Sequence, residues 1–220
     1  MARPPRLVVP GLAHYIVLRG HNGACVFVDS VDREAFLLTL RETMEDAPWQ
    51  LHAVAMLPTE AHLLLRPGTA DALPRAMQNL GRRYVGAFNQ RHGRTGTLWD
   101  GRYRSAVIEP GEMCLFALRR IALLALNDDA AASLDGGSAT PLRPMLLTAA
   151  PEYWALGNTP FEREDAYREL LRQELSRPQV AALEAAVRSG RVLGTTDFVV
   201  NLARDLQRPL TPARRGRPTR

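Results

Sequence analysis

The sequence contains no lysine: all 28 of its basic residues are arginine, against 23 acidic residues in a chain of 220. It has only two cysteines, Cys25 and Cys114, far apart and in apolar surroundings. This excludes a disulfide scaffold and a cysteine-rich zinc site, and favours a reducing compartment. No apolar run approaches the roughly 20 residues that cross a bilayer, which excludes a membrane-spanning protein. Two prolines stand at positions 4–5, where a signal peptide needs its apolar stretch, so we expect a cytoplasmic protein.

What the sequence does have is a concentrated positive charge. The net charge is +5 and the isoelectric point is near 9.8. Residues 82–104 hold six arginines and one acid, and the residues after Asp205 hold five arginines and no acid. A guanidinium group is planar and binds phosphate oxygens in pairs, which makes arginine a good ligand for nucleic acid. The placement of charge therefore suggests a nucleic-acid partner, associated with the bacterial nucleoid.

The order of the hydrophobic patterns predicts an α+β fold. Strand, helix, strand, strand, helix, strand and helix patterns follow one another, which is the split βαβ order of ferredoxin-like folds. We expect an antiparallel sheet with helices largely on one face. The strands are expected at 14–20, 49–57, 61–66 and 102–108, and the helices at 31–46, 71–92 and 111–126.

Composition changes after this core, which is expected to span residues 1–127. Residues 128–148 are rich in Gly, Ser, Pro and small side chains and are typical of a linker. A helical C-terminal region is expected over 149–207, with helices at 162–175, 178–189 and 195–206, and a basic tail over 208–220.

Two segments are candidates for contact with DNA. Residues 82–104 interleave arginines with rings and amides, a mixture that suits single-stranded nucleic acid, because arginine binds phosphate and rings stack on bases. In the tail, Arg215, Gly216 and Arg217 resemble the core of an AT-hook, which lies in a narrow minor groove. The other reading is a solvated helix face, a flexible loop and a solubilising tail. The residues of 82–104 predicted to contact DNA are Arg82, Arg83, Tyr84, Arg91, Arg94, Trp99, Arg102 and Arg104.

Several segments in order carry a resemblance to a known family. They are MARPPRLVVPGLAHYIVLRGHN, VFVDSVDREAFLLTL, WQLHAVAMLPTEAHLLL, RRYVGAFNQRHGRTGTLWDGRYRS and GRVLGTTDFVVNL, followed by RPLTPARRGRP. The chain resembles the REP-associated tyrosine transposases of the HUH superfamily. The resemblance implies a ferredoxin-like domain that cleaves and rejoins single-stranded DNA near hairpins. It also implies a divalent metal on a His-hydrophobic-His strand motif, completed by a polar residue after the nucleophilic tyrosine.

The metal motif departs from this pattern, because it reads Glu60-Ala61-His62. Residues two apart on a strand point to the same face, so Glu60 and His62 can still converge on one ion. A carboxylate in place of an imidazole favours a harder ion such as Mg²⁺ or Mn²⁺. The expected metal ligands are Glu60, His62 and Asn127, the asparagine that matches the family pattern.

The nucleophile departs as well, because its position falls on Leu123, which has no hydroxyl. We therefore assign no catalytic residue, and expect a DNA-binding relative of these transposases that recognises single-stranded or hairpin DNA without strand transfer. Two alternatives stay open. One is an active metal-dependent transposase with a rearranged site and another nucleophile. The other is an RNA-binding or interaction protein, since ferredoxin-like sheets also bind RNA.

Overall fold

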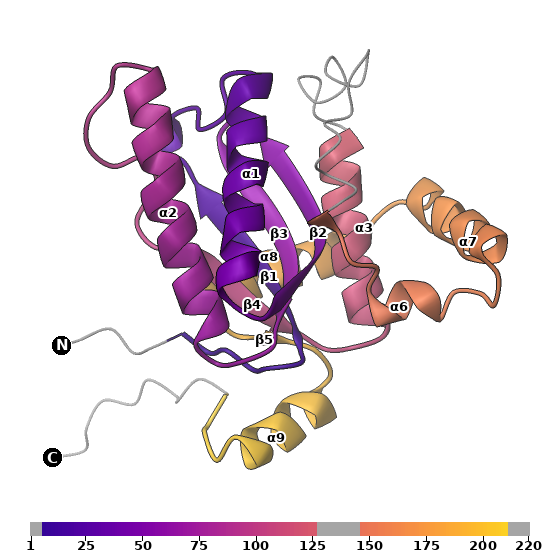
Figure 1. Cartoon of the computed structure of the whole chain (residues 1–220). Coiled ribbons are helices and arrows are strands. Elements are labelled where there is room, and N and C mark those ends of the chain that lie inside the picture. Colours follow the sequence, from indigo (N-terminus) through magenta and orange to yellow (C-terminus); the bar gives the residue numbers. More distant parts are fainter. Residues whose placement is uncertain (1–5, 127–145, 211–220) are drawn as a thin grey trace, which may run out of the picture.

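The computed structural model describes residues 6–126 and 146–210, and the architecture is mixed α/β around one five-stranded sheet (Figure 1). The strands are β1 (Ala13–Arg19), β2 (Trp49–Leu57), β3 (Glu60–Pro67), β4 (Arg104–Ile108) and β5 (Val192–Leu193). The helices are α1 (Ser30–Asp46), α2 (Ala72–Arg91), α3 (Glu112–Leu126), α6 (Pro151–Trp154), α7 (Pro160–Arg172), α8 (Arg177–Ser189) and α9 (Thr196–Asp205), with a 3₁₀ turn at His21–Gly23.

The sheet has the order β2-β3-β1-β4-β5. The central strand β1 pairs antiparallel with both β3 and β4, and β2 and β3 form an antiparallel hairpin. Only β5, at the edge, runs parallel to its neighbour β4. This is the split βαβ arrangement, so the predicted fold class is confirmed.

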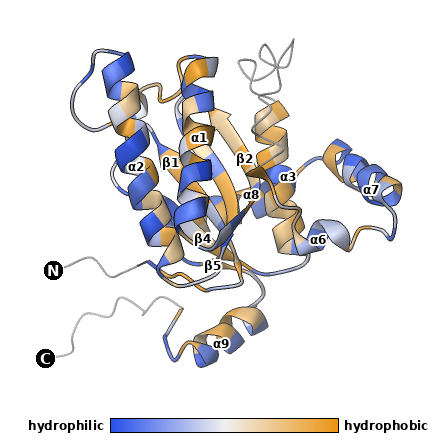
Figure 2. Ribbon diagram, viewed as in Figure 1, coloured by the Kyte–Doolittle hydropathy of each residue, from blue (hydrophilic) through white to orange (hydrophobic). Residues whose placement is uncertain are grey.

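Helices cover both faces of the sheet. Along β1, Ile16 and Leu18 pack into the core beneath α1 and α2, while Tyr15 and Val17 pack into a second core with residues of α3 and α8. Figure 2 shows hydrophilic and hydrophobic residues alternating along α1 and α2, as expected of helices with one buried face. The expectation of helices largely on one face was therefore wrong. The apolar side chains of β1 alternate toward two layers, and α3 and α8 fill the second.

The C-terminal region is built onto this core. Strand β5 extends the sheet, and α8 packs against β4 through the buried Leu183 and Val187. Leu202 of α9 packs with Val9 and Val107, whereas α6 and α7 lie beside α3 and project outward (Figure 1). Most of the predicted linker and most of the basic tail lie outside the described residues. In the described ranges, no helix has the length and apolar character needed to cross a membrane.

Candidate nucleic-acid interface

Strands β1 and β3 bring the motif residues together on the face covered by α3 and α8. Glu60 lies directly opposite Arg19 in the antiparallel register, and His62 lies opposite Val17. Because side chains alternate along a strand, Glu60 and His62 share a face, and Tyr15 of β1 lies on that same face. The predicted convergence of Glu60 and His62 is present.

A chain of hydrogen bonds links these side chains. The Tyr15 hydroxyl lies 3.0 Å from Nδ1 of His62, and Nε2 of His62 lies 2.9 Å from Oε1 of Glu60. Arg19 Nε donates to Oε2 of the same carboxylate at 2.8 Å. A carboxylate only accepts, so the network assigns the imidazole proton to Nε2 and leaves Nδ1 to accept from the tyrosine.

The same contacts set the charge states. The hydrogen bond from His62, followed by that from Arg19, lowers the pKa of Glu60 to about 2 although partial burial opposes the shift. Burial raises the pKa of Tyr15 above its ordinary value, so its hydroxyl is protonated at neutral pH. The site therefore contains a fixed carboxylate and a neutral phenol.

A small pocket of about 90 Å³ opens at this point between the sheet, α3 and α8. Its charged lining consists of four arginines against two glutamates: Arg19, Arg104, Arg120, Arg188, Glu60 and Glu184. Helix α8 closes one side with Leu183 and Val187. The surroundings of the Glu60–His62 pair are thus basic on balance.

The described residues of this pocket do not fit a divalent cation. Glu60 is already bonded to Arg19, and the Nδ1 atom of His62 is already bonded to Tyr15. Among the described side chains there is no group of three His, Cys, Asp or Glu that could hold a metal, and Asn127 lies outside the described residues. A cation would also face the lining arginines, whose charge repels it.

The nucleophile position adds no reactive group. Leu123 lies half-buried on α3 and is not part of the pocket lining, whereas Arg120, one turn earlier, is. The sequence reasoning did not connect Tyr15 with His62. A usable signal existed, because the split βαβ order places β1 beside β3.

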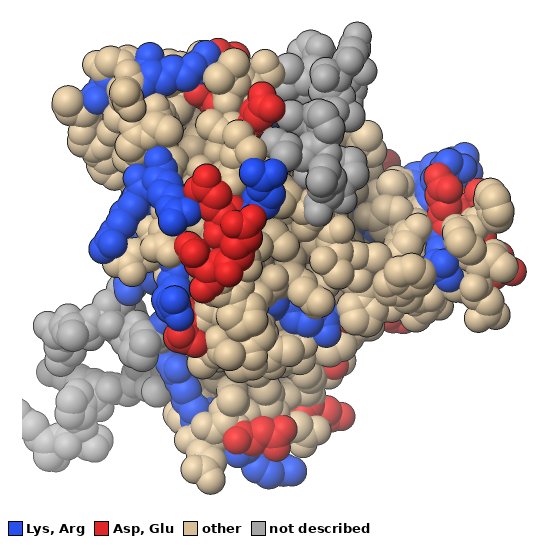
Figure 3. Space-filling model, viewed as in Figure 1, with Lys and Arg blue, Asp and Glu red and all other residues tan. Residues whose placement is uncertain are grey.

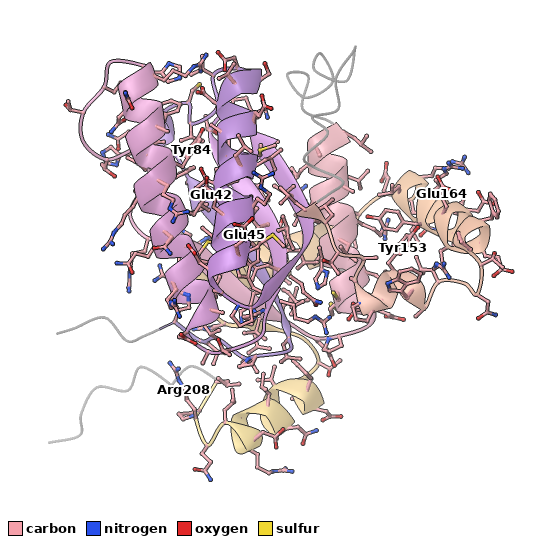
Figure 4. All side chains as sticks on the ribbon, viewed as in Figure 1. Glu42, Glu45, Tyr84, Tyr153, Glu164 and Arg208 are labelled. Carbon is pink, nitrogen blue, oxygen red and sulfur yellow. The ribbon has the colours of Figure 1, made fainter. Side chains whose placement is uncertain are left out.

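A second, larger hollow lies on another part of the molecule. This groove, of about 940 Å³, runs between α2, residues 6–8, residues 99–103 and residues 206–208. Its described lining contains no acidic residue and four arginines: Arg6, Arg82, Arg102 and Arg208. Its apolar lining includes Met77 and Val85 of α2. Figure 4 shows Arg208 beside the end of α9, below α2.

Two of the predicted DNA-contacting arginines lie in this groove. Arg82 and Arg102 are exposed, and neither has a hydrogen bond or ion pair with any described residue. Arg6 belongs to the same surface, where its guanidinium stacks 4.1 Å from the centre of the Tyr103 ring and donates to the Tyr103 carbonyl through Nε at 2.9 Å. The sequence reasoning missed Arg6 and Arg208 as members of this surface.

The other predicted arginines have different surroundings. Arg83 pairs with Glu42 at 2.8 Å and with Asp46 at 3.4 Å, and Arg91 binds two aspartates at the start of α1. In Figure 3 the acidic side chains gather over α1, with arginines along the neighbouring α2. Arg94 lies over the ring of Phe88, and Arg104 lines the Glu60–His62 pocket. The predicted set is therefore not one surface.

The two rings predicted to stack on bases are in the core. Tyr84 is 1% exposed and Trp99 is 7% exposed, and they stack on one another with centroids 5.9 Å apart. Figure 4 shows Tyr84 between α1 and α2, and its hydroxyl donates to the Val26 carbonyl. A buried ring offers no free face to a base, so the expectation that these rings stack on bases is corrected. The predicted tail contacts, Arg215, Gly216 and Arg217, lie outside the described residues.

Comparison with known proteins gives a structural similarity only. No family model and no curated protein matches the sequence. One similar structure is that of a REP-associated tyrosine transposase bound to a REP hairpin, with a TM-score of 0.48, 14% identity, and coverage of 68% of this chain and 93% of that chain. A second, from Deinococcus radiodurans R1, is described as a candidate transposase, with a TM-score of 0.38, 24% identity, and coverage of 50% and 88%. The chain is thus similar in structure to transposases, one of which was solved with a DNA hairpin.

Proposed function

We propose that this protein is a transposase-like DNA-binding protein that holds single-stranded or hairpin DNA without transferring strands. The observation that carries the proposal is the groove beside α2, in which Arg82 and Arg102 have no described partner and the described walls contain no acidic side chain. An unpaired guanidinium beside an acid-free surface attracts phosphate, and neutralising phosphates supplies most non-specific DNA affinity. We place this activity in the cytoplasm, on nucleoid DNA.

The apolar lining of the groove favours DNA with unpaired nucleotides over DNA that is entirely double-stranded. Met77, Val85 and the aliphatic Leu7 present apolar surface between the arginines. Unstacked bases bury their faces on such surfaces, while paired bases in a duplex expose only their edges and backbone. A volume of about 940 Å³ lies at the upper end of ordinary ligand sites, enough for more than one nucleotide.

The proposal that strands are not transferred is supported by the missing hydroxyl at Leu123 and by the described lining of the Glu60–His62 pocket, which does not suit a cation. One observation favours a second candidate, an active enzyme with a rearranged site: the Tyr15 hydroxyl contacts His62. Against it, Tyr15 is only 2% exposed, and helix α8 packs over the same face of the sheet. An attacking hydroxyl needs direct access to phosphorus, which this packing denies.

Binding and chemistry are tested with one set of labelled oligonucleotides. A REP-type DNA hairpin with a single-stranded extension, its duplex form and the matching RNA hairpin are titrated at several salt concentrations. We expect salt-dependent binding that is tightest for the DNA hairpin with its extension. Tighter binding to the RNA would replace the proposal with the RNA-binding alternative.

The same hairpin is then incubated with Mn²⁺ and run on a denaturing gel. We expect no covalent protein–DNA adduct. An adduct that disappears in Tyr15→Phe would overturn the non-transferring assignment in favour of the rearranged enzyme.

A further inference from the structure

The pocket beside Glu60 and His62 differs from the groove in both size and chemistry. Its volume is about 90 Å³, roughly three times the share of one liquid water molecule. That is on the scale of one phosphate group and too small for a nucleotide. A nucleotide-binding role therefore belongs to the groove, and only a small ion suits this pocket.

The charge of the lining selects the sign of that ion. Arg188 of α8 is exposed and has no ion pair or hydrogen bond with any described residue. Arg120 lies 3.6 Å from Glu184, and Arg104 lies 3.7 Å from Asp100, both beyond hydrogen-bonding distance. These three guanidinium groups can therefore turn toward an anion without breaking a close bond.

Of the two acids that line the pocket, Glu60 is already neutralised, whereas Glu184 has only the loose contact with Arg120. Both oxygens of Glu60 accept hydrogen bonds, one from Arg19 and one from His62. Tyr15 also lines the pocket, and its hydroxyl is bonded to Nδ1 of His62. The carboxylate therefore repels an incoming anion less than a free carboxylate would, and the loosely held arginines dominate.

We propose that this pocket is a metal-independent oxyanion site, in which Arg104, Arg120 and Arg188 hold one phosphate group. It rests on the proposed function in one respect: the first source of that group is a phosphate of bound DNA. Free inorganic phosphate has the same chemistry and is the second source. Guanidinium groups here supply the charge that a divalent cation would otherwise bring to a phosphate.

A shallow hollow adjoins the pocket. Its volume is about 330 Å³, and it shares Arg19 and Glu60 with the pocket lining. This hollow is bordered by the 3₁₀ turn at His21–Gly23 and by the turn between β2 and β3, and its charged lining is Arg19 against Glu60 and Asp100. An extended strand lying there would bring one of its phosphates to the pocket mouth.

The first experiment locates the phosphate. Hairpins with a single-stranded extension carry one neutral methylphosphonate linkage at each position in turn, and affinity is measured in EDTA. We expect one linkage of the DNA, distinct from those that contact the groove, to weaken wild-type binding by about tenfold when it is made neutral. This is the scale of a charge-assisted hydrogen bond. In Arg188→Ala that position loses its sensitivity.

The matched control is Arg177→Ala, which removes an arginine of the same helix that does not line the pocket. This variant should keep the sensitive position. A sensitive position that persists in Arg188→Ala, or one that appears only with Mn²⁺, overturns the proposal.

A second experiment separates the two sources and does not depend on DNA binding. Thermal unfolding of the wild type and of both variants is followed with and without inorganic phosphate, with chloride at equal ionic strength as reference. A phosphate-specific rise in Tm, lost in Arg188→Ala and kept in Arg177→Ala, supports the site even where the methylphosphonate scan is flat, and assigns it to free phosphate. If neither the sensitive linkage nor the phosphate-specific rise in Tm is found, the oxyanion site is overturned. If only hairpin binding fails, the proposed function is overturned and the site is not.

Discussion

Arg82 and Arg83 are neighbours in the chain, yet α2 directs them to opposite surroundings. Arg83 reaches α1 and pairs with Glu42 at 2.8 Å and Asp46 at 3.4 Å, while Arg82 lines the acid-free groove. Successive residues of a helix are about 100° apart, which is enough to separate a neutralised charge from an available one. This contrast defines which part of the basic segment is offered to DNA, and it supplies the natural control for testing it.

Tyr15→Phe should destabilise the fold without disturbing its shape. The change leaves Nδ1 of His62 without its donor in a buried site, which costs about 1–2 kcal/mol of the free energy of unfolding. Urea denaturation measures this. Tyr103→Phe is the comparison, because no hydrogen bond of the Tyr103 hydroxyl is present among the described residues, and it should change the free energy by less than about 0.5 kcal/mol. Equal effects in both variants would contradict the described contact.

Arg91→Ala should reduce stability more than DNA affinity. Arg91 bonds the Asp32 carboxylate, which is 2% exposed, and removing the guanidinium leaves that charge with His92 at 3.0 Å and the Val28 amide. Only the carboxylate of this pair is buried, so the loss of one of its partners should lower the free energy of unfolding, while the remaining hydrogen bonds limit the effect. Arg94→Ala is the control, since it loses a contact with Phe88 only. A large loss of hairpin affinity in Arg91→Ala at unchanged stability would return Arg91 to the DNA surface.

Stability should fall between pH 6.5 and pH 4 because of His14. This imidazole is fully buried, and burial lowers its pKa from 6.5 to about 4, although a bond to the Leu12 carbonyl opposes the shift. As the pH falls, His14 therefore binds a proton in the unfolded chain before it does so in the folded protein. The contribution of neutral, buried His14 to the free energy of unfolding is fully present above pH 6.5. It declines as the pH falls through this window, by up to roughly 3 kcal/mol.

The check is the pH dependence of urea unfolding in the wild type and in His14→Gln. Glutamine keeps a donor for Leu12 and an acceptor for the Val9 amide but does not titrate. The variant should show a shallower slope across the window, although its absolute stability is lower. Parallel slopes would show that His14 does not set this dependence.

The sequence could predict most of the fold because its signals are local. The apolar runs of β1 and β3 and the helical periodicity of α2 are signals within single elements, so the predicted bounds agree with the structure within about two residues. The two-residue β5 and the one-turn α6 are too short for any period to show. The second helical layer was missed because the hydrophobicity of α3 indicates burial but not which face of the sheet it covers.

The site was less predictable, because charge pairing depends on distant residues. Arg91 and Asp32 are 59 positions apart, and the local sequence around each residue contains no pattern that predicts their contact. The burial of Tyr84 did have a signal, since Leu80, Tyr84 and Phe88 recur at helical spacing and form one apolar stripe. Reading the aromatics of α2 with the helix period, rather than with the basic composition, would have placed that ring in the core.

The measurement that tests the central claim most directly is hairpin affinity as a function of salt for Arg82→Ala, Arg102→Ala and Arg83→Ala. All three remove one positive charge, so net charge does not distinguish them. The two groove variants should each weaken binding by roughly tenfold and lower the salt slope by about one, because each loses a phosphate contact. Arg83→Ala should change affinity by less than about twofold, since its charge is already neutralised by α1. Equal losses in all three would show that overall charge, and not the groove beside α2, holds the DNA.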